Sequence, residues 1–184
     1  MKLVIHAGTL RGFGSGVVGR SLIEHIVHTS GDHQVAASIP SCWTEAPQTG
    51  GRLKQVETLT AGALSKFSFE NIRLRRLIHD FEADRLLSLT DTSLLKGPIP
   101  HALLVQQAYL AYDLKDLKDQ LPSRFRKKLQ MMNLYMELGL KHVDQITVQT
   151  EHMKTAFMAR WGVHPDRLTV IPSAIQPAAA ALAQ

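Results

Sequence analysis

The sequence lacks several features that would place it in a specialised class of protein. A single cysteine, Cys42, excludes an internal disulfide and fits a reducing compartment. No stretch reaches the roughly 20 apolar residues that a membrane-spanning helix needs. The short apolar run Leu3-Val4-Ile5 meets His6 and a glycine-rich stretch at once, so we expect no secretory signal peptide. These absences predict a cytoplasmic protein.

What is present suits one globular domain. The chain has 184 residues, of which 45% are hydrophobic and 20% charged, so it can form a sizeable core and disorder is not indicated. Its net charge is +5 and its isoelectric point is about 9.5. This basic excess fits an anionic substrate, an anionic membrane surface or nucleic acid, and it equally fits an ordinary basic surface.

Short apolar runs alternate with segments of helical periodicity. We predict strands at residues 3–5, 35–39, 56–59, 86–89, 102–105, 146–148 and 168–171. Helical spacing is found around residues 18–27, 69–78, 125–136 and 153–161. Strands separated by helices indicate βαβ units. The predicted fold is therefore an α/β, Rossmann-like three-layer domain with a mainly parallel sheet.

A glycine-rich motif follows the first predicted strand. Glycines let the backbone approach a phosphate or a sugar closely, so Gly14, Ser15 and Gly16 are candidates for binding a diphosphate. Residues 14–19 also match the letters of the dinucleotide fingerprint. However, no acidic residue closes the second strand, and this argues against NAD. The alternative is a tight turn with close helix packing.

Polar residues also follow three later strands. Gln106, Gln107 and Tyr109 come after one strand and suit hydrogen bonding to sugar hydroxyls, or simple anchoring of a loop. Asp91 is either a functional carboxylate or an exposed loop residue. The pair of Gln149 and Thr150 is a further candidate for sugar binding, although a helix cap explains much of Thr150.

No metal or cofactor is predicted. Among the nine histidines, His25 and His28 are three residues apart, but no carboxylate or cysteine has matching spacing. No G-x-S-x-G motif is present, and Cys42 has no nearby partner for nucleophilic catalysis.

The C-terminal part of the chain resembles family-4 glycosyltransferases. The resemblance rests on residues 144–154 (DQITVQTEHMK), 161–163 (WGV) and 167–172 (RLTVIP). The first domain of that family typically closes with such a strand, a Met-Lys helix, a Gly-Val turn and a strand ending in Ile-Pro. The first loop with Gly19-Arg20, and residues 100–109, are also similar, although the family often has His-Asp where Gln106-Gln107 stands.

The resemblance implies one half of a two-domain GT-B enzyme. Residues 1–176 would form the acceptor-side domain, and residues 177–184 a linker or the start of a donor domain that is absent here. The partner domain would bind the nucleotide sugar, and the acceptor would be a saccharide or a lipid-linked molecule. Transfer would retain the anomeric configuration and need no metal, and no nucleic acid is expected. Arg20 could sense negative charge or be solvated. The alternative function is a non-catalytic module that binds a nucleotide or a partner protein.

One helix suggests a contact with the inner face of a membrane. The basic residues Arg124, Arg126, Lys127 and Lys128 begin a helix whose apolar positions include Phe125, Leu129, Met132 and Met136. Such a helix can lie on an anionic surface. The preferred interpretation is that the charges are merely solvated, because Met131, Leu134, Tyr135 and Leu138 are expected to belong to the core.

Overall fold

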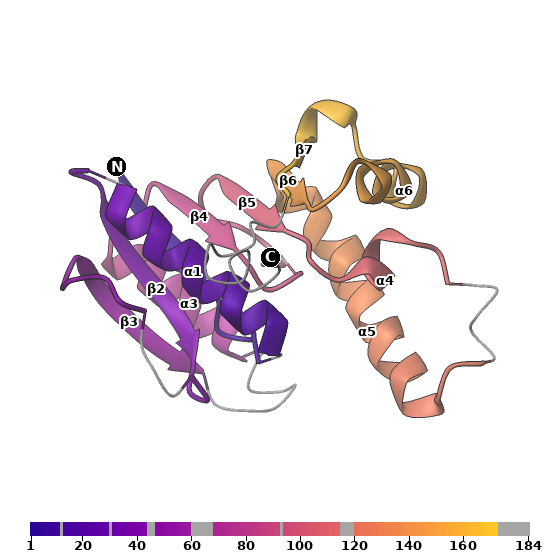
Figure 1. Cartoon of the computed structure of the whole chain (residues 1–184), viewed down its shortest axis with the longest axis horizontal. Helices are drawn as coiled ribbons and strands as arrows, with labels where there is room; N and C mark the ends of the chain where they lie inside the picture. The colour runs from indigo at the N-terminus through magenta and orange to yellow at the C-terminus, as the bar shows by residue number, and fades with distance from the viewer. Residues whose placement is uncertain are drawn as a thin grey trace, which may run out of the picture.

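The computed structural model describes residues 1–11, 13–29, 31–43, 47–59, 68–92, 94–114 and 120–172. Seven strands form one parallel sheet in the order β3-β2-β1-β4-β5-β6-β7 (Figure 1). The strands are β1 (Lys2–His6), β2 (Gln34–Pro40), β3 (Leu53–Leu59), β4 (Arg85–Ser88), β5 (His101–Leu104), β6 (Gln145–Val148) and β7 (Leu168–Val170). All seven strands were predicted within a few residues of these bounds.

Helices cover both faces of the sheet. Helix α1 (Phe13–Thr29) connects β1 to β2, while η1 (Phe69–Arg73) and α3 (Leu74–Asp80) lead to β4. Helix α5 (Ser123–Gly139) leads to β6 and α6 (Glu151–Trp161) to β7, with short turns α4 (Ala108–Ala111), η3 (Leu140–His142) and η4 (Pro165–Arg167) beside them. The steps from β1 to β2 and from β2 to β3 run opposite to the later steps, so right-handed crossovers put α1 on one face and α3, α5 and α6 on the other.

Alternation along the strands explains the core. Ile5 packs in a cluster with Ile23 of α1, whereas the adjacent Val4 packs with Leu74 of α3 on the opposite face. A third cluster joins β5 and β6 to α5 and α6 and includes Met136 and Phe157. Successive side chains of a strand point to opposite faces, so the near-continuous apolar runs are those of a sheet covered on both sides.

Two predicted helix ends are confirmed. The Oγ1 atom of Thr150 accepts a hydrogen bond from the backbone N–H of Met153 at 3.0 Å, which caps the start of α6. At the other end Gly162 adopts the left-handed conformation with φ of 64°. A side chain there would be strained, which is why glycine ends this helix.

The prediction for the later turns of α5 is wrong. Met131, Leu134 and Leu138 are exposed rather than part of the core, with exposed fractions of 47%, 54% and 44%. The side of α5 that faces the sheet is formed by Leu129 and Met136, about 180° away around the helix. Within the described residues, no helix is both long enough and apolar enough to cross a bilayer.

Candidate functional site

The candidate site lies at the carboxyl ends of the central strands. In an open parallel sheet, ligands bind in the crevice at this edge. The segments that follow β1, β4, β5 and β6 here contain the residues singled out from the sequence. The ribbon places the start of α1 and the segment after β5 near this edge (Figure 1).

Asp91 ties the segment after β4 to the segment after β5. Its Oδ1 atom accepts hydrogen bonds from the backbone N–H groups of Gln106, at 2.5 Å, and of Gln107, at 2.9 Å. The residue is 4% exposed and has φ of 60°, a conformation that Asp tolerates better than most residues. The interpretation of Asp91 as an exposed loop residue is therefore wrong. We call this contact the Asp91 clamp.

The two glutamines held by the clamp are half-buried. The Gln106 Nε2 atom donates to the carbonyl of Leu89 at 3.3 Å, so this side chain reinforces the link between β4 and β5. Gln107 has extended backbone at the start of α4, and its side chain makes no capping hydrogen bond there. The backbone of Gln107 is thus fixed at the edge of the sheet, and its side-chain amide does not cap α4.

Tyr109 leans on α5. Its ring meets that of Phe125 edge-on at 5.7 Å, and its hydroxyl donates to the Met132 Sδ atom at 3.8 Å. Burial, together with the nearby charge of Asp91, raises the pKa of the Tyr109 phenol. The hydroxyl therefore stays protonated at neutral pH and remains a hydrogen-bond donor.

The glycine motif belongs to α1 rather than to a loop before it. Gly14, Ser15 and Gly16 lie in the first turn of α1, and Gly12 lies outside the described residues. A Cβ atom on Gly14 would meet nothing within 4 Å, whereas one on Gly16 would lie 3.4 Å from the Trp43 Nε1 atom. Close packing thus explains Gly16, and Gly14 is the position at which a ligand could approach. Ser15 is half-buried between them.

Trp43 organises the surroundings of this turn. Its indole N–H donates to the carbonyl of Leu10 at 3.0 Å, and the guanidinium of Arg20 lies 5.5 Å from the centre of its ring. A Cβ atom on Gly19 would come within 2.4 Å of the Leu10 Cδ1 atom. Arg20 is therefore not simply a solvated side chain or a group reserved for a ligand. Its guanidinium lies over an aromatic ring.

At the next strand along, Gln149 and Thr150 follow β6. The hydroxyl of Thr150 caps α6, and Gln149 is half-buried. Beside them the Tyr112 hydroxyl lies 2.7 Å from the His152 Nδ1 atom, which joins α4 to α6. The structure thus gives Thr150 a structural role, and Gln149 remains a candidate for ligand contact because of its position after β6.

A buried polar group that the sequence did not reveal lies next to this edge. The His6 Nδ1 atom is 2.6 Å from the Ser38 Oγ atom, and the Nε2 atom is 3.2 Å from the Glu70 Oε1 atom. His6 and Glu70 are each 1% exposed, and the His6 ring stacks on Phe69 at 5.8 Å. The available signal was the position of His6 at the end of β1, two residues after Val4 and hence on the same face.

A cavity of about 380 Å³ lies between α5, α6 and the segment after α4. It is lined on α5 by Arg126, Gln130, Asn133 and Glu137, and on α6 by Arg160 and Trp161. Arg160 donates to the carbonyls of Tyr109 and Tyr112 and stacks over Trp161. Across the parts of the chain that the structure describes, no three His, Cys, Asp or Glu side chains are grouped as metal ligands.

Neither a protein-family model nor a curated protein sequence matches the chain. Solved structures do. The UDP-GlcNAc 2-epimerase of Neisseria meningitidis, bound to UDP-GlcNAc, is similar with a TM-score of 0.59 and 11% identity, over 92% of this chain and 45% of that chain. The UDP-GlcNAc 2-epimerase of Methanocaldococcus jannaschii has a TM-score of 0.54 and 12% identity, over 93% and 45%.

A third structure, Arabidopsis thaliana UGT89C1 complexed with UDP, has a TM-score of 0.43 and 11% identity, over 98% of this chain and 53% of that chain. The chain spans less than half the length of the two epimerases. At these identities the likeness shows the fold alone. The domain is an α/β unit with a seven-stranded parallel sheet that matches one half of a GT-B-like fold.

Proposed function

We propose that this chain is the acceptor-side half of a glycosyltransferase that moves a sugar from a nucleotide sugar to a saccharide or a lipid-linked acceptor. A second domain would bind the nucleotide. The proposal rests on the Asp91 clamp, because it holds two amide-bearing residues at the ligand-binding edge of the sheet. The likeness of residues 144–172 to family-4 enzymes supports it and implies retention of the anomeric configuration.

Three of the candidate residues have roles in this proposal. Backbone N–H groups in the first turn of α1, at Gly14, would approach the donor diphosphate, which a helix N-terminus favours. Gln107 and Tyr109 would hold sugar hydroxyls. The acceptor hydroxyl would form the new bond to the anomeric carbon while the nucleoside diphosphate leaves with the bonding electrons, and the hydroxyl proton is released. The contribution of this chain is therefore positioning.

The second candidate function is a module that binds a nucleotide or a partner without catalysis. The observation that favours it is the use of Asp91, the carboxylate nearest to the edge glutamines, to hold two loops together. On this alternative the same edge binds its ligand and nothing is transferred.

Mass spectrometry of reaction products separates the two functions. The 184-residue chain, and a longer protein that contains it together with a second α/β domain, are given a panel of nucleotide sugars and saccharide acceptors. We expect a glycosylated acceptor only from the longer protein. Epimerised nucleotide sugar without transfer, or sustained transfer by residues 1–184 alone, would contradict the proposal. Ligand binding without any product would favour the module.

Substitution at Gly14 tests the role of α1. In the longer protein, Gly14→Val places a branched side chain in the open space through which the diphosphate would approach. Turnover should therefore fall at least tenfold, while the melting temperature changes little. Gly14→Ala, which adds a single methyl group, should have a smaller effect on turnover. Unchanged turnover in Gly14→Val would assign the glycine to architecture.

A further inference from the structure

Helix α5 presents three different faces. The first packs on the core through Phe125, Leu129, Met132 and Met136. The second lines the cavity with Arg126, Gln130, Asn133 and Glu137. The third comprises Arg124, Lys127, Met131, Leu134 and Leu138, which recur at intervals of three and four residues and therefore share one side of the helix. We call this third face the outer stripe.

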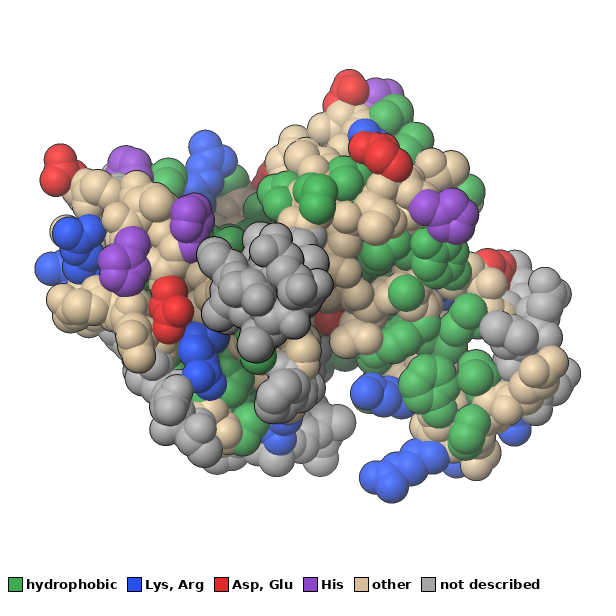
Figure 2. Space-filling model, in the orientation of Figure 1, with side chains coloured by type: hydrophobic (Ala, Val, Ile, Leu, Met, Phe, Trp, Pro, Cys, Tyr) green, Lys and Arg blue, Asp and Glu red, His purple; other side chains and the backbone are tan. Residues whose placement is uncertain are grey.

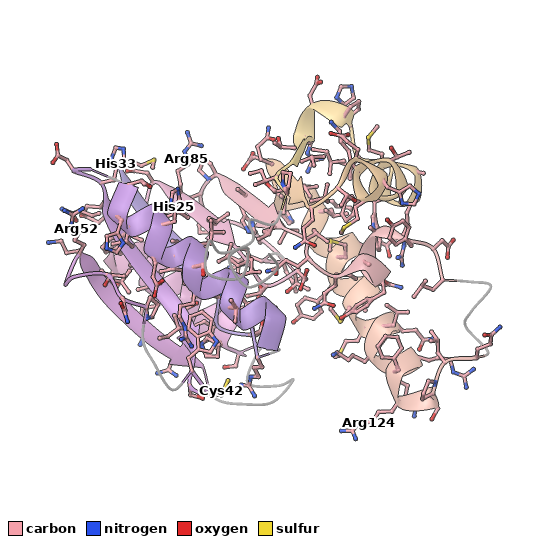
Figure 3. All side chains as sticks on the ribbon, in the orientation of Figure 1. His25, His33, Cys42, Arg52, Arg85 and Arg124 are labelled. Atoms are coloured by element: carbon pink, nitrogen blue, oxygen red, sulfur yellow. The ribbon has the colours of Figure 1, made fainter. Side chains whose placement is uncertain are left out.

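The outer stripe is exposed along its whole length. Its three apolar side chains are all about half exposed, and Arg124 and Lys127 are exposed as well. The only acidic residue of α5, Glu137, lies on the cavity face instead. Arg124 lies at the end of α5 that projects from the domain, and it points away from the neighbouring elements (Figure 3). Lys and Arg side chains gather at this end beside hydrophobic ones (Figure 2).

We propose that the outer stripe docks on an anionic lipid surface. A helix lying in the membrane interface buries apolar side chains at the boundary of the acyl chains and places cations among the headgroups. The outer stripe has both, since Met131, Leu134 and Leu138 continue directly from Arg124 and Lys127. Lys128 is exposed next to the stripe and adds a third cation. The inference does not depend on whether sugar is transferred.

The charge of the stripe favours a lipid surface over other occupants. A stable pair of copies needs about 800 Å² of buried surface on each partner, far more than three half-exposed side chains offer. A parallel pair of such stripes would bring positive charges together, and an antiparallel pair would place Arg124 opposite Leu138, so neither pairing supplies an acidic partner. Nucleic acid would use Arg124 and Lys127 but would leave the three apolar side chains in water. An anionic bilayer satisfies both parts.

Sedimentation with sucrose-loaded vesicles tests the proposal on the 184-residue chain. We expect binding to phosphatidylglycerol vesicles, little binding to phosphatidylcholine vesicles, and weakening at high salt because the charges are screened. Each basic residue near an anionic surface strengthens binding about fivefold. The triple variant Arg124→Gln, Lys127→Gln, Lys128→Gln should therefore bind about a hundredfold more weakly.

Matched variants locate the contact on the outer stripe. The pair Leu134→Ser, Leu138→Ser should weaken vesicle binding at least tenfold, whereas Val17→Ser, at an exposed position of α1, should leave it unchanged. Arg126→Gln removes a charge from the cavity face of the same helix. Because this charge lies near the membrane without facing it, its loss should weaken vesicle binding only about twofold. Circular dichroism confirms that each variant is folded.

Several outcomes would overturn the proposal. They are no binding to phosphatidylglycerol, binding that ignores lipid charge, or binding that survives both stripe variants. Ultracentrifugation without lipid provides one more. A dimer that Leu134→Ser dissociates would assign the stripe to a second copy of the chain instead.

Discussion

The two faces of the sheet are covered in different ways. On one face lies α1, and the side chains beneath it are apolar, from Ile5 on β1 to Leu104 on β5. On the other face, η1, α3, α5 and α6 enclose buried polar side chains, among them His6, Glu70 and His101. Both α1 and α5 have 17 residues, yet α1 is pressed against its surroundings through glycines while α5 leaves a whole apolar side exposed. Beneath the first face the side chains serve packing, whereas the second face combines packing with buried polar groups and with an exposed apolar stripe.

The largest expected effect tests whether the two faces carry equal weight in stability. Ile23→Ala on α1 and Met136→Ala on α5 each remove a side chain that is fully buried, so each should lower the free energy of unfolding by about 2–5 kcal/mol. The matched control Leu134→Ala, on the outer stripe, should change it by less than about 0.5 kcal/mol. Urea denaturation measures all three. A large loss in Leu134→Ala would mean that the stripe is covered within the chain.

On the face of the sheet that carries buried polar side chains, His101 should make the free energy of unfolding depend on pH. Burial, reinforced by the charge of His6 and opposed by Asp144 and Glu70, lowers the pKa of His101 from 6.5 to about 4. The folded state thus binds this proton less well than the unfolded state, and stability falls as pH drops from 6.5 towards 4. The loss is about 1.4 kcal/mol per pH unit, or about 3 kcal/mol across the window.

Denaturation between pH 7 and pH 4 measures this contribution, and His101→Leu is the control. Neither ring nitrogen of His101 has a hydrogen-bond partner within the described residues, so leucine leaves no group there unpaired. The variant should show a pH dependence that is weaker than that of the wild type. An equal pH dependence of stability in the wild type and in His101→Leu would mean that burial does not lower the pKa of His101.

A pair of glycine variants tests the close packing of α1. Gly19→Ala should destabilise the protein by about 1–3 kcal/mol, because the new methyl carbon would lie 2.4 Å from the Leu10 Cδ1 atom. Gly14→Ala meets no neighbour and should be neutral or stabilise by up to about 1 kcal/mol, since alanine favours the helix. Thermal melts of both variants give the comparison. Equal effects would remove the distinction between the two glycines.

The smallest effect concerns the N-terminal cap of α6, which lies on the same face of the sheet as α3 and α5. Thr150→Ala removes the side chain that accepts from the N–H of Met153 and should cost about 1 kcal/mol. Thr155→Ala, inside the same helix, loses only a bond from its hydroxyl to the carbonyl of Glu151 and should be close to neutral. If the two variants melt alike, the cap contributes nothing beyond helix propensity.

The fold could be predicted from the sequence because its signals are local. Short apolar runs, the Thr150 cap and Gly162 each depend on neighbouring residues, and helices separate the strands at most of the connections. The two errors arose where tertiary packing decides. Glycines 14 and 16 suggested a loop, but Trp43 packs where Gly16 lacks a side chain, and the segment is helical.

The faces of α5 illustrate the second error. The helix has two apolar stripes, one through Leu129 and Met136 and one through Met131 and Leu138, and periodicity alone does not say which faces the sheet. The candidate site was found only in part, for a similar reason. Asp91, Gln106 and Gln107 were singled out separately, but a contact between residues 15 positions apart has no signature in the sequence, and neither has the pairing of His6 with Glu70, 64 positions apart.

The Asp91 clamp also has a consequence for protein engineering. Its two hydrogen bonds reach main-chain N–H groups, so they form regardless of which side chains residues 106 and 107 carry. The shape of the loop is thereby separated from its chemistry. A library that randomises position 107 while keeping Asp91 and Gln106, whose side chain also binds the carbonyl of Leu89, would present new side chains on an unchanged backbone, provided that proline is left out because it has no N–H to donate. The same separation would allow specificity to diverge in nature without rebuilding the domain.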